Sequence, residues 1–151
     1  MNERTIDRDS VASIAQRFEA KPEMLVQILQ EIVAQHGWIS TDVIRQLADI
    51  VNLSRAEVHG VVEYYHDFRT EPPGSHIIRI CQAEACQAMG SRKLSTYASA
   101  SLDGEDVTLE PVYCLGNCAC SPAIMVDGKT YGRVSNERFD EIMASLGESG
   151  R

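Results

Sequence analysis

The chain has 151 residues, of which 44% are hydrophobic and 24% charged, an ordinary balance for a soluble globular protein. Its formal net charge of −8 is spread over both halves without a basic stripe, so neither nucleic acid nor an anionic membrane surface is an expected partner. No apolar run approaches the roughly 20 residues of a membrane-spanning helix, and the first residues carry no secretory signal. We therefore expect a cytoplasmic protein without direct membrane insertion.

The first part of the chain, residues 1–72, has apolar side chains at helical spacing throughout. Start signals divide it into four short helices that begin at Asp9 or Ser10, at Pro22, at Ser40 or Thr41, and at Ser54. Gly37 is expected to end the second helix, and Ser54 with Glu57 has the form of a capping box. Four short helices with tight connections predict a small helical bundle.

The period of the pattern changes after the segment 71–74, Glu-Pro-Pro-Gly, which cannot continue a helix and is expected to link two domains. The elements predicted beyond it are a strand at 77–81, a helix at 86–100, a strand at 107–113, a hairpin of 123–126 and 129–131, and a helix after Ser135. Asp127 and Gly128 favour a type I′ turn in the hairpin. We therefore predict an α+β chain, with a helical N-terminal domain at 1–72 and an α/β domain close to the thioredoxin arrangement at 73–151.

All five cysteines fall in the second part of the chain. Cys81 and Cys86 form a C-x4-C group, Cys114 and Cys118 form a C-x3-C group, and each group follows a predicted strand. If the two strands share a sheet, both loops meet at one end of it and the four thiolates converge. A [2Fe–2S] cluster requires such a set, because each of its two irons needs two protein ligands besides the bridging sulfides.

The residues around these cysteines suit a negatively charged cluster. Cys86 lies at the beginning of a predicted helix, where unpaired N–H groups favour negative charge. Gly116 leaves room for backbone N–H groups to approach the sulfurs, which is one means of setting a reduction potential. No Lys or Arg lies between Cys114 and Pro122, so we expect the counter-charge there to come from backbone dipoles or from a partner.

Other sites use the same residue type. A structural zinc site also binds four cysteines and fits these spacings loosely, so zinc and scattered buried thiols stay open on spacing alone. A thioredoxin-type dithiol enzyme is disfavoured because the chain has no C-x2-C motif. A Rieske centre is disfavoured because no histidine lies in either cysteine loop. Cys120 competes with Cys118 for the position of fourth ligand.

Four stretches of the sequence resemble a known family: 58–65 (VHGVVEYY), 71–81 (EPPGSHIIRIC), 114–118 (CLGNC) and 121–123 (SPA). On these motifs the chain resembles the thioredoxin-like [2Fe–2S] subunit family. That family includes the small iron–sulfur subunit of complex I, the small subunit of NAD-reducing hydrogenases, and the gamma subunit of NAD-dependent molybdenum formate dehydrogenases. The chain is short, with little beyond the last predicted helix, and in this it looks most like the formate dehydrogenase gamma subunit.

The resemblance implies a helical domain followed by a thioredoxin-like domain that holds one [2Fe–2S] cluster on Cys81, Cys86, Cys114 and Cys118. It implies that Cys120 is a spectator. It also implies a partner subunit that binds FMN and NAD, and a further iron–sulfur or molybdenum subunit that would carry a molybdenum cofactor. The chain itself has no nucleotide-binding glycine motif, so we expect a non-catalytic subunit that exchanges single electrons with the FMN of its partner. A zinc-stabilised interaction module without a redox role is the alternative of another class.

Overall fold

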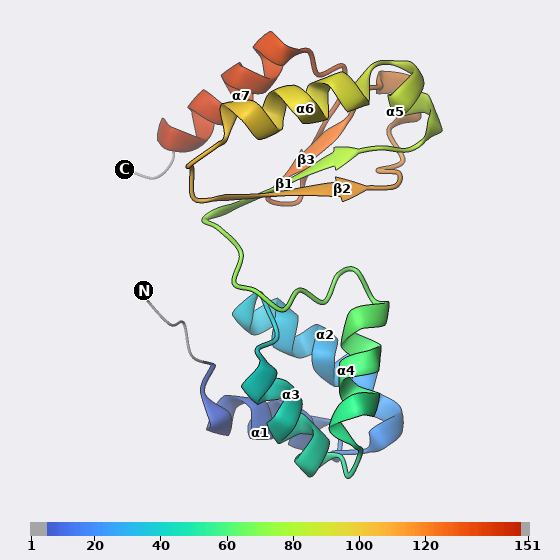
Figure 1. Cartoon of the computed structure of the whole chain (residues 1–151), viewed down its shortest axis with the longest axis vertical. Helices are drawn as coiled ribbons and strands as arrows, with labels where there is room; N and C mark the ends of the chain where they lie inside the picture. The colour runs from blue at the N-terminus through green and yellow to red at the C-terminus, as the bar shows by residue number, and fades with distance from the viewer. Residues whose placement is uncertain (1–5, 149–151) are drawn as a thin grey trace. The chain divides into compact units, whose positions relative to one another are not determined.

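The computed structural model describes residues 6–148, and the chain divides into two compact units (Figure 1). One unit ends at Pro73 and the other begins at Gly74, inside the Pro-Pro-Gly segment that interrupts the helical pattern. Each unit has its own cluster of buried apolar side chains. Each is therefore organised by its own packing.

The first unit is a bundle of four α-helices around one core. Its helices are α1 (Arg8–Arg17), α2 (Leu25–His36), α3 (Thr41–Ile50) and α4 (Arg55–Tyr64), and a 3₁₀ turn at Pro22–Met24 precedes α2. The apolar stripes of all four helices supply the core, whose largest fully buried side chains are Ile28, Leu29, Ile32, Ile39 and Leu47. The predicted helical bundle is confirmed.

Capping hydrogen bonds confirm three of the predicted helix boundaries. Ser40 Oγ accepts a hydrogen bond from the backbone N–H of Val43 at 3.2 Å. Ser54 and Glu57 form the predicted capping box, in which each side chain accepts a hydrogen bond from the other residue's backbone N–H. Gly37 ends α2 with a φ of +84°, a conformation that glycine adopts without the steric cost of a Cβ.

The first helix begins earlier than predicted. Asp9 and Ser10 were the expected caps, but Asp7 is the N-cap and Arg8 is already helical. The Asp7 side chain makes no capping hydrogen bond. The boundary therefore lacks the side-chain interaction on which the prediction depends.

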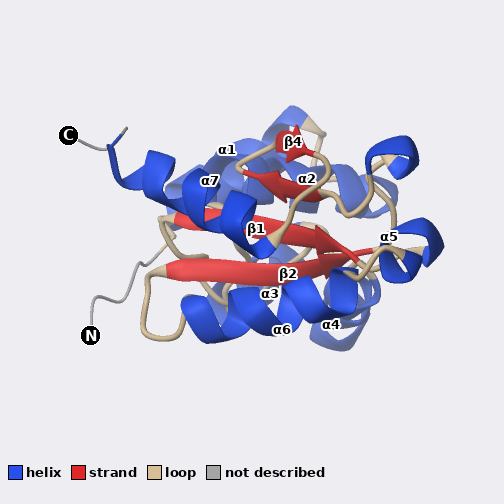
Figure 2. Cartoon of the chain, turned by 90° about the horizontal axis from the view of Figure 1, so that it is seen from above, coloured by secondary structure: helices blue, strands red, loops and turns tan. Residues whose placement is uncertain are grey.

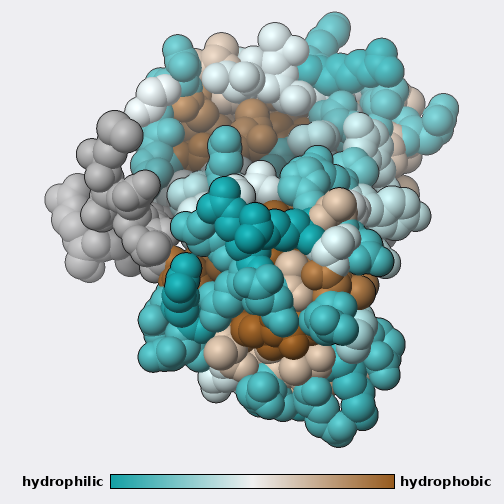
Figure 3. Space-filling view, turned by 60° about the horizontal axis from the view of Figure 1, so that its bottom comes forward, coloured by the Kyte–Doolittle hydropathy of each residue, from teal (hydrophilic) through white to brown (hydrophobic). Residues whose placement is uncertain are grey.

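Aromatic side chains gather at the end of α4. Tyr64 and Tyr65 are both exposed, whereas Phe68 is buried in the core of the helical unit. The ring centroids of Tyr65 and Phe68 lie 5.4 Å apart. Phe68 therefore packs in the core of the helical unit, whereas Tyr64 and Tyr65 lie on its surface. On the face seen in Figure 3, hydrophilic residues cover most of the surface, and apolar residues gather in a few patches between them.

The second unit contains a four-stranded sheet in the order β2-β1-β3-β4. Its strands are β1 (His76–Cys81), β2 (Val107–Val112), β3 (Ile124–Val126) and β4 (Lys129–Tyr131). β1 and β2 are parallel, and β3 pairs antiparallel with both β1 and β4. The two longest strands, β1 and β2, lie side by side and point in the same direction (Figure 2).

Helices α6 (Ser91–Ser101) and α7 (Asn136–Glu148) cover one face of this sheet (Figure 1). Alternate residues of β1 and β3 point into the core between sheet and helices, and the buried set comprises Ile78, Ile80, Ile124, Val126, Leu94, Ala98, Phe139 and Ile142. This arrangement confirms the predicted α+β class, in which a helical bundle precedes an α/β domain. Among residues 6–148, no helix combines the length and apolar character needed to cross a bilayer.

The helix predicted at 86–100 is in fact two helices. A short helix, α5 (Glu84–Ala88), ends before Gly90, whose φ of +94° breaks the helical path, and α6 begins at Ser91. The hairpin prediction is confirmed, because Asp127 and Gly128 both have positive φ, of +48° and +84°, as a type I′ turn requires.

Candidate metal centre

Both cysteine loops leave the sheet at the same end. β1 ends at Cys81, whose register partner on the parallel strand β2 is Val112, and Cys114 lies two residues beyond β2. The backbone N–H of Gln82 donates to the carbonyl oxygen of Val112 at 2.8 Å, which fixes the start of the first loop against the end of the second strand. Both strands point towards α5, the helix that carries Cys86 (Figure 2). The predicted meeting of the two loops at one sheet end is confirmed.

The cysteines differ in exposure. Cys81 and Cys86 are buried, each with 2% of its surface exposed, and pack with Ala123 in a small apolar cluster. Cys114 and Cys118 are exposed, and Cys120 is intermediate. The group is therefore closed on the side of the sheet and open towards solvent on the side of the second loop.

The thiol of Cys118 is affected by thiols of both loops. The pKa of Cys118 is raised, first by a hydrogen bond with the Cys114 thiol and by its charge, then by burial and by the charges of Cys86 and Cys81. The two loops therefore bring four thiols within electrostatic reach of each other. Because like charges oppose the ionisation of each thiol, such a group favours a bound cation that would compensate several thiolates at once.

Backbone N–H groups also surround these sulfurs. Burial raises the pKa of the Cys81 thiol, but hydrogen bonds from the N–H groups of Ala83, Cys114 and Leu115, together with the interaction with the Cys86 side chain, lower it overall. The N–H of Gly116 donates to Cys114 Sγ at 3.3 Å. An N–H group at Gly116 therefore does approach a sulfur, as the sequence predicts. Together these N–H donors stabilise negative charge on the cysteine sulfurs.

Cys114 itself has an unusual backbone conformation. Its φ is +103°, in a region that residues with a Cβ rarely adopt. Such conformations cost free energy and persist where the surrounding structure imposes them, often at functional sites. Cys114 is thus held in place by the fold of its loop, because its own backbone preference disfavours that position.

A segment distant in sequence supports the second loop. After β4, the N–H of Arg133 donates to the carbonyl oxygen of Cys120 at 2.6 Å, and the N–H of Val134 donates to that of Pro122 at 3.0 Å. Gly132 passes so close that a Cβ there would lie 2.6 Å from Cys120 Cβ and 2.8 Å from its carbonyl oxygen. The sequence reasoning did not identify Gly132, and the only signal for it was a glycine directly after the hairpin.

Ser121 is a second residue that the sequence reasoning missed. It is one of only two buried polar residues found in the described part of the chain, with 8% of its surface exposed. The Cys86 thiol donates to Ser121 Oγ at 3.4 Å, and Ser121 Oγ donates to the carbonyl oxygen of Cys118 at 2.8 Å. One hydroxyl therefore connects the two cysteine loops.

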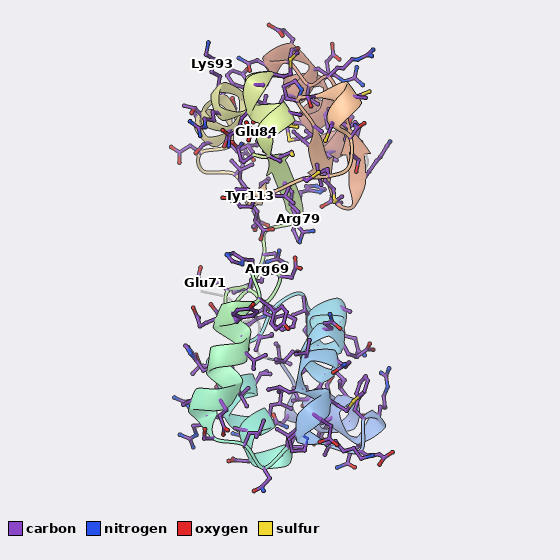
Figure 4. All side chains as sticks on the ribbon, turned by 90° about the vertical axis from the view of Figure 1, so that its right-hand side faces the viewer. Arg69, Glu71, Arg79, Glu84, Lys93 and Tyr113 are labelled. Carbon is purple, nitrogen blue, oxygen red and sulfur yellow. The ribbon has the colours of Figure 1, made fainter. Side chains whose placement is uncertain are left out.

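Residues outside the loop from Cys114 to Pro122 place aromatic, apolar and positively charged side chains beside it. Tyr113, directly before Cys114, is 74% exposed (Figure 4), and Met89 after α5 is 62% exposed. Lys93 and Arg133 line an open groove along Ala119–Pro122. Positive side chains from other elements therefore lie beside the loop, although only backbone dipoles or a partner were expected to supply counter-charge there.

The donor set fits a [2Fe–2S] cluster in its chemistry. Four thiols come from two loops, and N–H donors point at two of the sulfurs, Cys81 and Cys114. Among residues 6–148, no three His, Cys, Asp or Glu side chains form a group arranged to hold a metal ion, so the fit is one of donor chemistry.

Comparisons with known proteins bear on the same residues. The sequence profile of the thioredoxin-like [2Fe–2S] ferredoxin family matches residues 11–147. An NADH-quinone oxidoreductase subunit of Escherichia coli K12 is 26% identical over 145 residues, which is 91% of this chain and 87% of that protein. The corresponding protein of Buchnera aphidicola subsp. Acyrthosiphon pisum is 30% identical over 129 residues, covering 80% and 79% of the two chains.

A solved structure shares the fold. The crystal structure of NAD⁺-reducing [NiFe]-hydrogenase in the H₂-reduced state superimposes with a TM-score of 0.65 at 19% sequence identity. The match covers 83% of this chain and 22% of the hydrogenase chain. The profile match spans most of the residues that the structure describes, so the chain belongs to the thioredoxin-like [2Fe–2S] ferredoxin family, and its cofactor is one [2Fe–2S] cluster.

Proposed function

We propose that this chain is an electron-transfer subunit of a multi-subunit NAD-linked oxidoreductase, with its cluster held by Cys81, Cys86, Cys114 and Cys118. The observation that carries the proposal is that two loops bring these four cysteines to one end of β1 and β2, where N–H groups of the second loop donate towards Cys81 in the first. A [2Fe–2S] cluster bound there supplies one-electron chemistry. The thiolates hold the irons, and the N–H groups around Cys81 and Cys114 stabilise the negative charge.

The exposure of the second loop supports transfer to a partner subunit. Cys114 and Cys118 reach the surface, and exposed Tyr113 adjoins them. Electron tunnelling weakens steeply with distance, so a redox partner has to approach the side on which the site is not covered by protein. We propose that this partner binds FMN and NAD, because the chain has no nucleotide-binding glycine motif of its own.

The names of the relatives favour one type of complex. The Escherichia coli and Buchnera relatives are both named as subunits of NADH-quinone oxidoreductase, and the structure with a similar fold is an NAD⁺-reducing hydrogenase. We propose the NADH-quinone oxidoreductase type first and the hydrogenase type second. The gamma subunit of formate dehydrogenase is the third type, and a molybdenum-containing partner would be needed to establish it.

Serine substitutions of two neighbouring cysteines test the ligand assignment. Cys118→Ser is expected to abolish the visible absorption of the cluster and the EPR signal of its reduced form. Cys120→Ser, a matched change two residues away, is expected to leave both signals and two irons per chain. The reverse pattern would assign the fourth ligand to Cys120. A colourless wild-type protein that contains zinc and no iron would instead favour the zinc-stabilised module.

Co-purification tests the proposed complex. The tagged full-length chain, isolated under native conditions, is expected to retain a partner that contains FMN and oxidises NADH. A nickel-containing subunit would identify a hydrogenase, and a molybdenum-containing subunit a formate dehydrogenase. If the chain carries its cluster but is isolated alone, without any flavin-containing subunit, the proposed role in a complex is wrong.

A further inference from the structure

The hydroxyl of Ser121 has a position that the ligand assignment alone does not explain. It accepts from the Cys86 thiol at 3.4 Å and donates to the Cys118 carbonyl oxygen at 2.8 Å. Cys86 is almost fully buried, and so is Ser121. Hydrogen bonds are stronger in such surroundings because little water competes for them. A polar side chain is therefore kept in the apolar floor of the site, between its two loops.

A count of protons shows what changes when Cys86 binds iron. A thiol has one proton to donate, and here it goes to Ser121 Oγ. A cysteine that ligates a metal is a thiolate, which has no proton and can only accept. The contact between Cys86 Sγ and Ser121 Oγ can then persist as a hydrogen bond only if the serine hydroxyl becomes the donor. Rotation of the hydroxyl proton from the Cys118 carbonyl towards the sulfur achieves this without movement of a heavy atom.

We propose that Ser121 is a positioning residue that donates a hydrogen bond to the Cys86 thiolate and thereby raises the reduction potential of the cluster. The inference rests on the proposed function, in which Cys86 is a ligand. Reduction adds one negative charge to the cluster, so a donor at a ligand sulfur stabilises the reduced form more than the oxidised form. Unlike the N–H donors at Cys81 and Cys114, this donor is a side chain, so a substitution can remove it while the backbone stays the same.

Removal of the hydroxyl tests the proposal directly. In Ser121→Ala, the ratio of reduced to oxidised cluster at a fixed applied potential is expected to fall about tenfold, which corresponds to about 59 mV for one electron. The measurement is a redox titration of the purified full-length chain, followed by EPR or visible absorption. Ser75→Ala is the matched control, because Ser75 Oγ also donates to a backbone carbonyl, that of Asp106, but at the opposite end of β1. Its potential is expected to equal that of the wild type.

A second pair of variants keeps the proposal testable if Ser121→Ala does not take up its cluster. Ser121→Thr keeps the hydroxyl and is expected to retain the wild-type potential. Ser121→Val has nearly the same shape without the hydroxyl and is expected to show the lowered potential. Thr and Val variants with equal potentials would overturn the proposal, since only the hydrogen bond separates them. A role confined to holding the Cys118 carbonyl would change cluster retention and leave the potential of the loaded protein unaltered.

The outcomes also separate this inference from the proposed function. A wild-type chain without a two-iron cluster would overturn both. A loaded wild-type chain whose potential is matched by loaded Ser121→Ala would overturn the role of Ser121 alone and leave the four ligands in place. In the wild type, exchange into deuterated water is expected to shift the iron–sulfur vibrations, because the hydroxyl proton lies in a hydrogen bond to a ligand sulfur. Loss of this shift in Ser121→Ala, together with the lowered potential, would support the hydrogen bond itself.

Discussion

The two cysteine loops reach the same end of the sheet by different means. Cys81 is the last residue of β1, which is paired on both sides, and Cys86 lies in helix α5. Cys114 and Cys118 belong to an exposed loop, held by hydrogen bonds to the segment after β4. A strand and an α-helix therefore fix the first pair, whereas a 3₁₀ turn at Cys118–Cys120 and tertiary contacts fix the second. One site can thus combine a rigid buried half with an accessible half.

Alanine substitutions of one cysteine from each loop should give the largest effects. Cys81→Ala and Cys114→Ala are both expected to lose the cluster completely, because each removes a proposed ligand. Cys81→Ala removes a buried thiol and leaves the N–H groups that donate to it without their acceptor, so the cluster-free protein should be less stable than cluster-free wild type by about 1–3 kcal/mol. Cys114→Ala, at an exposed position, should change that stability by less than about 0.5 kcal/mol.

Iron content and urea unfolding of the second unit measure these two effects. Circular dichroism can follow unfolding, whereas tryptophan fluorescence cannot, because the single tryptophan, Trp38, belongs to the helical unit. Equal destabilisation by the two substitutions would contradict the distinction between a buried and an accessible half.

The same change at two glycines should have opposite effects. Gly132→Ala places a Cβ 2.6 Å from Cys120 Cβ, so the second loop has to shift, at a cost of about 1–3 kcal/mol and with reduced iron content. Gly60→Ala, in α4, meets no heavy atom within 4 Å and should stabilise the helical unit by about 0.5–1 kcal/mol. Thermal unfolding and iron analysis compare the two. Full iron content in Gly132→Ala would show that the loop does not depend on this close approach.

The smallest effect is expected at the hairpin turn. Burial raises the pKa of Asp127, but hydrogen bonds from the Ile77 N–H and the His76 side chain, with the charge of His76, lower it overall. A lowered folded-state pKa contributes stability that is present above the unfolded value of about 4 and is lost as pH falls through the folded value. Because both side chains are partly exposed, Asp127→Asn should cost less than about 1 kcal/mol at pH 7.

The pH dependence provides the check. The stability difference between wild type and Asp127→Asn is expected to be largest at pH 7, to begin to fall at about pH 4, and to disappear only below the lowered folded-state pKa, where Asp127 is protonated in both states. Urea unfolding at several pH values measures this difference in the free energy of unfolding. The contributions of acidic groups that both proteins share cancel in the difference. Iron content at pH 7 should be unchanged, because the turn lies at the end of the sheet opposite the cysteine loops. A difference that grows towards low pH would contradict the lowered pKa.

Local signals explain what could be predicted from the sequence. The capping box at Ser54, the glycine at Gly37 and the hairpin turn at Asp127 each involve residues within a few positions of each other. The meeting of the two cysteine groups could be predicted because each follows a strand, and parallel neighbouring strands end on the same side. The division of one predicted helix at Gly90 was missed, since a glycine inside an apolar periodic pattern is often tolerated.

The missed residues act through contacts that no local pattern contains. Gly132 matters because it passes against Cys120, and Ser121 matters because it lies beside Cys86 in another loop. Lys93 and Arg133 lie beside the second loop only because α6 and the segment after β4 bring them there. Each effect depends on how separate elements pack, and the sequence on its own could supply the four candidate thiols but not their surroundings.

The one-sided exposure of the cysteines has a consequence for assembly. With the proposed ligands, the buried Cys81 and Cys86 are accessible only from the side of Cys114 and Cys118. A scaffold protein that delivers iron and sulfide has to use that side, and so does a redox partner. The two cannot occupy it together, so cluster insertion has to precede docking. Once docked, the partner would also close the route by which chelators and oxidants reach the metal.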